Sequence, residues 1–186
     1  MRSFVRSSAW GASLLLMTLH ATPSPAQVAA LPEAVTRDVG GLALRGEAVL
    51  RFFGLKVYDI RLWTPEKAAP VEELAAGPFA LELVYDLSIK GRDIAERSVK
   101  EMRTQGWRDE AQLKRWGQEM AHIFPDIAQG DALIGVSIPG KGARFYSRDK
   151  LIAVVADPEF SRAFFDIWLS VKTSEPRLRK KLLGSG

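Results

Sequence analysis

Hydrophobic and polar positions alternate strictly along residues 79–87, FALELVYDL. Neighbouring side chains of a β-strand point to opposite faces, so a period of two predicts a strand with one buried face. The polar positions of this segment, Glu82 and Asp86, fall on the opposite side from the aromatic and leucine residues. The buried side is expected to carry Phe79, Leu81, Leu83, Tyr85 and Leu87.

Two segments with helical spacing follow this strand. The first predicted helix runs from about Asp93 to Arg103, and the second begins with Asp109 as its N-cap and ends before Pro125. Each helix has one apolar face that needs a partner, and the sheet is the obvious candidate. These faces are Ala95, Val99 and Met102 in the first helix, and Leu113, Trp116, Met120 and Ile123 in the second.

Three short apolar segments come next: ALIGVSI, ARFYS and LIAVVA. The connections at 139–142 and 148–150 have hairpin length, so these segments should form an antiparallel meander. Asp157 and Pro158 then open a helix with an apolar stripe, and SEPRLRKKLLG forms a short basic helix at the end. The element order predicts an α+β protein with one antiparallel sheet that helices cover on one side. The stripe is Phe160, Phe164, Ile167, Trp168 and Val171.

Polar residues interrupt an apolar run at 50–63, LRFFGLKVYDIRLW. With Gly54 and Leu55 as a two-residue hairpin loop of type II′, Arg51 lies directly across from Tyr58. These two residues would share an inner face, with Asp59 and Arg61 on the other one. The expected inner face also contains Val49, Phe53, Ile60 and Leu62.

An arginine beside a phenol on an apolar face can bind an anion, because the guanidinium donates two parallel hydrogen bonds and the hydroxyl a third. The alternative is structural: Arg51 extends to solvent or pairs with Glu47, and Tyr58 is a half-buried tyrosine of the sheet. If Arg51 and Tyr58 prove to point to opposite faces, the next candidates are Arg45, Arg61 and Tyr85.

The first 26 residues have the order of a secretory signal peptide. Arg2 and Arg6 precede an apolar stretch from Ala9 to Leu19, and small residues surround a cleavage position after Ala26. The apolar part is shorter than the roughly 20 residues that span a bilayer; an uncleaved anchor is the alternative. We expect one exported, periplasmic or secreted domain at 27–186, with no membrane span after cleavage.

Composition excludes several classes of site. Cysteine is absent, which excludes thiol catalysis and Cys-ligated metals, and cleavage would leave His122 as the one histidine of the mature chain. We therefore expect no metal and no cofactor. Cleavage also lowers the formal net charge from +4 to +2, and no basic stripe with interleaved aromatics indicates nucleic acid. The oligomeric state stays open.

Several segments resemble the bacterial branch of the chalcone isomerase-like family, in unbroken order from about Gly40 to Gly184. They include LRGEAVLRFFGLKVYDIRLW, IPGKGARFY, DPEFSRAFFDIWL and TSEPRLRKKLLG. The resemblance implies an open-faced β-sandwich with a ligand cleft between sheet and helices. It also implies one of two activities: cyclisation of chalcones, or fatty-acid binding in which an arginine and a tyrosine hold the carboxylate.

Site residues carried over from this resemblance match in part. The tyrosine of KVY corresponds to Tyr58, whereas the family's Gly-x-Gly-x-Arg spacing places its arginine at Leu50, one residue before Arg51. The tyrosine and asparagine of the isomerases fall near Ile94 and near Lys100 or Glu101, and both are missing. A hydroxyl before the last helix would be Thr173 or Ser174, and either residue could instead cap that helix.

These observations favour a non-catalytic binding protein for a fatty acid or another apolar carboxylate. The expected ligand-binding residues are Arg51, Tyr58, Tyr85 and Thr173. The first alternative is a chalcone isomerase-type lyase that acts on a phenolic or enone substrate, in which Arg51 would stabilise an oxyanion and Tyr58 would orient the substrate. The second is a structural protein with a closed cleft.

Overall fold

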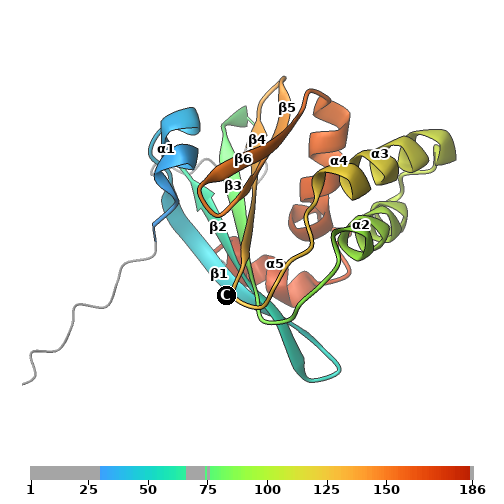
Figure 1. Ribbon diagram of the computed structural model, residues 1–186, viewed down its shortest axis with the longest axis horizontal. Helices are drawn as coiled ribbons and strands as arrows, with labels where there is room; N and C mark the ends of the chain where they lie inside the picture. The colour runs from blue at the N-terminus through green and yellow to red at the C-terminus, as the bar shows by residue number, and fades with distance from the viewer. Residues whose placement is uncertain (1–29, 66–73, 75, 185–186) are drawn as a thin grey trace, which may run out of the picture.

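The computed structural model describes residues 30–65, 74 and 76–184, so the predicted signal peptide lies outside the described residues. A six-stranded antiparallel sheet forms its centre, with the strands in chain order. Figure 1 shows helices α2, α3, α4 and α5 on one side of this sheet and α1 on the other. The strands are β1 (Ala43–Phe52), β2 (Leu55–Thr64), β3 (Phe79–Tyr85), β4 (Ala132–Ile138), β5 (Gly142–Ser147) and β6 (Lys150–Val155).

Helices α2 to α5 begin and end close to the predicted positions, whereas α1 was not predicted. In α3 the Asp109 carboxylate accepts a hydrogen bond from the Gln112 amide at 3.0 Å, and in α4 the Asp157 carboxylate accepts from two amides of the first turn. Both predicted N-caps are confirmed. The helices are α1 (Glu33–Val39), α2 (Gly91–Gln105), α3 (Glu110–Ile123), α4 (Pro158–Leu169) and α5 (Pro176–Leu182).

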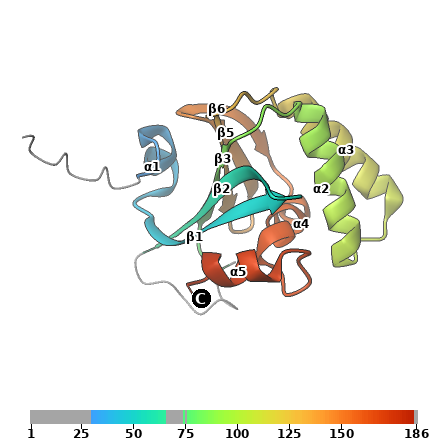
Figure 2. The same cartoon turned by 90° about the horizontal axis from the view of Figure 1, so that it is seen from below.

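The main core lies between the sheet and helices α2 to α5 (Figure 2). The aromatic stripe of α4 is buried there, where Phe164 contacts the ring of Phe145 at a centroid distance of 5.1 Å. Val171 does not belong to this stripe, because α4 ends at Leu169 and Val171 is 80% exposed. The predicted antiparallel meander and the α+β class are confirmed.

A second, smaller core forms on the opposite face, where α1 packs against the sheet. Val35 of α1 is fully buried beside Trp63, and the Tyr146 hydroxyl donates a hydrogen bond to the Asp38 carboxylate. Arg144 pairs with the same carboxylate at 2.8 Å. Strand β3 is therefore buried on both faces, although its alternating sequence predicted one buried face.

The β1–β2 hairpin has a different register from the predicted one. Phe53 and Gly54 form the turn, with φ of 49° and 82°, and two positive φ values are typical of a type I′ turn. Leu50 consequently pairs with Tyr58, and a bulge follows before Arg51 pairs with Lys56. The predicted pairing of Arg51 with Tyr58 is wrong by one residue, and this turns Arg51 to the outer face.

No helix among the described residues combines the length and the apolar character that crossing a membrane requires.

Candidate functional site

A cavity of about 350 Å³ lies between the inner face of the sheet and helices α2 and α4. Its walls are mainly apolar, with aliphatic side chains from four strands and aromatic side chains from β5 and α4. The apolar lining includes Leu50, Val57, Leu81, Leu83, Leu133, Ile94, Phe145, Phe164 and Ile167. A volume of this size falls within the usual range for small-molecule sites, roughly 300–1,000 Å³.

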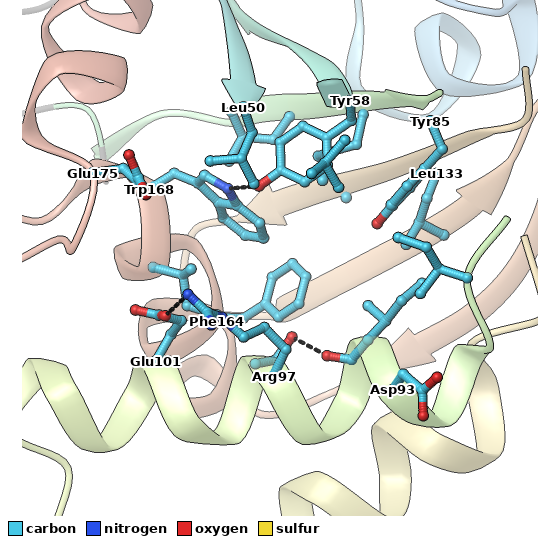
Figure 3. Close-up of a pocket in the computed structure, with 18 of the residues that line it drawn as sticks. Leu50, Tyr58, Tyr85, Asp93, Arg97, Glu101, Leu133, Phe164, Trp168 and Glu175 are labelled. Atoms are coloured by element: carbon cyan, nitrogen blue, oxygen red, sulfur yellow. Dashed lines mark hydrogen bonds and ion pairs between the residues drawn. The ribbon is translucent and has the colours of Figure 1, made fainter. Parts of the chain in front are cut away.

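Two tyrosines project from the sheet into this cavity (Figure 3). Tyr58 of β2 and Tyr85 of β3 pair in register across the two strands, and their rings meet edge to face at 5.5 Å between centroids. The side chains are 8% and 3% exposed, so both hydroxyls are held in an apolar surrounding. The structure brings together these two of the four predicted ligand-binding residues.

The two hydroxyls differ in their partners. The Tyr58 hydroxyl accepts a hydrogen bond of 3.0 Å from the indole N–H of Trp168, whereas the Tyr85 hydroxyl bonds to no other described residue. Burial raises the pKa of both phenols above the ordinary value of about 10. Both tyrosines therefore stay neutral at physiological pH and can act as hydrogen-bond donors to a ligand.

Helix α2 contributes a stripe of mixed polarity to the opposite wall. Ile94, Arg97, Ser98 and Glu101 follow one another at spacings of three and one, which places them on one face of the helix. Arg97 pairs with Glu101 at 2.6 Å. The apolar positions of α2 alone do not predict this stripe, although the helical spacing 94, 97, 98, 101 is a signal for a shared face.

The connection between α4 and α5 lines the cavity next to Glu101. The Ser174 hydroxyl donates to the second Glu101 carboxylate oxygen at 2.8 Å, so both oxygens of Glu101 are engaged. Glu175 also lines the cavity, and its carboxylate has no hydrogen bond or ion pair to a described residue. Figure 3 places Glu175 close to Trp168, on the far side of the cavity from Asp93.

Arg51 does not lie in the cavity. It is exposed on the other face of β1, where its guanidinium donates to the Gly54 carbonyl at 3.3 Å. Leu50 occupies the position across from Tyr58 and lines the cavity. The expectation of an arginine and a tyrosine side by side is therefore corrected, and the family's own spacing pointed to the right position, which holds leucine in this chain.

Thr173 is buried but does not line the cavity. Its hydroxyl donates to the Ile167 carbonyl at 2.6 Å and accepts from the Glu175 amide at 3.2 Å, which makes it a turn residue between α4 and α5. The neighbouring hydroxyl, Ser174, is the one that reaches the cavity wall.

Arg45 and Arg61, the next candidates for a site arginine, also lie outside the cavity. Arg45 donates to the Leu183 carbonyl at 3.4 Å, and Arg61 contacts the carboxylates of Glu47 and Glu82 on the outer face of the sheet. Neither lines the cavity. Over the described part of the chain, no group of three or more His, Cys, Asp or Glu side chains is arranged to hold a metal ion.

The profile of a chalcone isomerase-like family matches residues 26–184. The chain belongs to the chalcone isomerase-like family. This match confirms the family resemblance, and the sheet with its helical layer agrees with the fold that the resemblance implied. Shared fold does not determine function, because the same scaffold carries different sites in different proteins.

Two further comparisons show proteins to which the chain is similar. It is 31% identical over 107 residues to an uncharacterized protein of Haemophilus influenzae, and the match covers 58% of this chain and about half of that relative, 52%. The fold is similar to the crystal structure of a fatty-acid binding protein from Arabidopsis thaliana, with 13% identity and a TM-score of 0.56. That match covers 77% of this chain and 87% of the plant protein, and it concerns the fold alone.

Proposed function

We propose that this protein is a non-catalytic binding protein for a fatty acid or a similar apolar ligand. The observation that carries the proposal is the cavity of about 350 Å³, whose walls are mainly apolar and which contains the two buried phenols Tyr58 and Tyr85. Such a cavity binds an apolar body by excluding water and orients one polar end by a small number of hydrogen bonds.

The unpartnered hydroxyl of Tyr85 supports a ligand in this cavity. This hydroxyl is accessible from the cavity and is not sealed inside the protein. A ligand oxygen within reach of the phenol can accept its hydrogen bond, which adds a directional contact. The fold shared with a fatty-acid binding protein makes long-chain acyl compounds the first ligands to test.

The residues around Tyr58 support binding over isomerisation. The resemblance implied an arginine that stabilises an oxyanion, and Leu50 stands at that position across from Tyr58. Ile94 and Glu101 line the cavity near the positions where the isomerases carry a tyrosine and an asparagine. Leu50 carries no charge and Arg97 is already paired with Glu101 at 2.6 Å, so the site lacks a free cation to stabilise a phenolate substrate.

Export to the periplasm completes the proposal and rests on the pattern of residues 1–26. N-terminal sequencing of the protein recovered from a periplasmic extract tests it. We expect the mature chain to begin at Gln27, whereas a chain that keeps Met1 and stays in the membrane fraction would support the uncleaved anchor.

Displacement of a fluorescent apolar probe by acyl compounds of increasing chain length, both fatty acids and their esters, tests ligand binding. We expect Ile94→Trp, which fills the cavity from α2, to abolish displacement, and Lys100→Trp on the exposed side of the same helix to leave it unchanged. Equal displacement by both variants would place the ligand outside this cavity. Turnover of a chalcone by the purified protein would contradict the non-catalytic assignment.

A further inference from the structure

The charged side chains around the cavity are mostly acidic. Among the described lining residues, Asp93, Glu101 and Glu175 carry carboxylates, and Arg97 carries the one guanidinium. Arg97 is already paired with Glu101 at 2.6 Å and is about half exposed at the rim. The cavity wall thus offers a bound ligand no cation that is free of a carboxylate partner.

The position best placed to supply such a cation holds an aliphatic side chain. Leu50 pairs with Tyr58 in the register of β1 and β2 and lines the cavity. The next residue, Arg51, points away and bonds to the Gly54 carbonyl. The surroundings of the phenols on the β1 side are therefore apolar.

The phenols themselves offer neutral donors. Trp168 donates to the Tyr58 hydroxyl, which leaves the Tyr58 proton free to be donated, and the Tyr85 hydroxyl has no partner among the described residues. Two neutral donors satisfy an uncharged acceptor oxygen well. A carboxylate bound there would be a buried anion without a cation and near other carboxylates, which carries a large desolvation cost.

We propose that the cavity takes its acyl-chain ligand in an uncharged form, with an ester, ketone, alcohol or protonated acid oxygen at Tyr58 and Tyr85, and discriminates against the carboxylate. This inference rests on the proposed binding function and specifies its ligand class. Specificity arises because the neutral end pairs with the phenols, while the ionised end loses its water without compensation.

The test compares a medium-chain fatty acid with its methyl ester in probe displacement. At about pH 8, where the acid is ionised, we expect the ester to bind at least about tenfold more tightly, since an unpaired buried charge costs several kcal/mol. On lowering the pH toward roughly 4.5, the ratio of the two affinities should approach one.

The ester has no ionisable group, so the ratio removes those effects of pH on the protein that act on both ligands alike. The charged groups that face the site are Asp93, Arg97 and Glu101 from α2 and Glu175 from the α4–α5 connection, and the two phenols face it from the sheet. If the carboxylate binds as tightly as the ester at about pH 8, the inference is overturned and the binding function stands. If neither ligand displaces the probe at either pH, both the inference and the proposed binding function fail.

Two variants with a matched control sharpen the test. Leu50→Arg installs a cation across from Tyr58 and should shift the affinity ratio toward the carboxylate, whereas Val49→Arg on the outer, 42% exposed position should leave the ratio unchanged. Glu175→Gln removes one unpaired carboxylate and should also improve carboxylate binding. A ratio that changes in neither Leu50→Arg nor Glu175→Gln would contradict the electrostatic origin of the selectivity.

Discussion

The indole N–H of Trp168 donates to the hydroxyl of Tyr58 at 3.0 Å, and this bond joins α4 to the sheet at the wall of the cavity. Both side chains are 8% exposed, so water cannot readily replace either partner. Tyr85, the register partner of Tyr58, lacks such a bond to the described residues. Tyr58 therefore both joins α4 to the sheet and faces the ligand cavity, whereas Tyr85 only faces the cavity.

Removal of each hydroxyl should separate these roles. Tyr58→Phe leaves the Trp168 N–H buried without an acceptor, and we expect the free energy of unfolding to fall by about 1–3 kcal/mol. Tyr85→Phe removes a hydroxyl that has no partner, so stability should stay within about 0.5 kcal/mol while ligand affinity falls. Urea unfolding together with probe displacement measures both. Equal destabilisation by the two variants would contradict this assignment.

Gly46 allows α5 to pack directly on β1. A Cβ at this position would lie 2.3 Å from the Lys181 carbonyl oxygen and 2.5 Å from that of Leu182. We expect Gly46→Ala to lower the unfolding free energy by about 1–3 kcal/mol, because the backbone of α5 has to move. Gly41→Ala is the matched control, since nothing lies within 4 Å of its Cβ. Urea midpoints that fall equally in both variants would argue against this contact.

The docking of α1 should depend on pH. The hydrogen bond from Tyr146 lowers the pKa of Asp38 below its ordinary value of 3.8, and Arg144 acts in the same direction. A carboxyl group whose pKa is lower in the folded state stabilises the fold above its unfolded pKa, and this contribution is lost as the pH falls through the folded pKa. The stability difference between the protein and Asp38→Asn should therefore shrink below about pH 4.

Urea unfolding of both proteins at a series of pH values measures this difference. The pKa of the Tyr146 hydroxyl is raised to about 12 by burial and by the bond to Asp38, so Tyr146 does not titrate in the acid range. A difference that stays constant from neutral to acid pH would show that the Asp38 charge does not hold α1.

Much of the fold was predictable because the spacing of apolar residues agreed with the positions of turn and cap residues along the chain. The meander of β4, β5 and β6 followed from short apolar segments joined by hairpin-length connections, and the caps Asp109 and Asp157 marked two helix starts. The packing of α1 on the outer face was not predicted, because its anchoring contacts join residues far apart along the chain, such as Asp38 and Tyr146, which are 108 positions apart.

The candidate site was predicted in part, and one turn explains the main error. Glycine at the first turn position suggested Gly54–Leu55, whereas the chain places Phe53 at positive φ, a conformation that is unfavourable for a bulky side chain. This difference of one residue exchanges Arg51 for Leu50 on the inner face. Tyr58 and Tyr85 were unaffected, since their faces are set by the apolar alternation of β2 and β3.

The most direct measurement is the identification of lipid that co-purifies with the protein. Lipid is extracted from the purified protein and from Ile94→Trp, whose cavity is filled, and both extracts are analysed by mass spectrometry. We predict that the protein carries about one apolar, oxygen-bearing ligand per chain and that the variant carries none. An extract without such a ligand, from a protein that also binds none when it is supplied, would contradict the account.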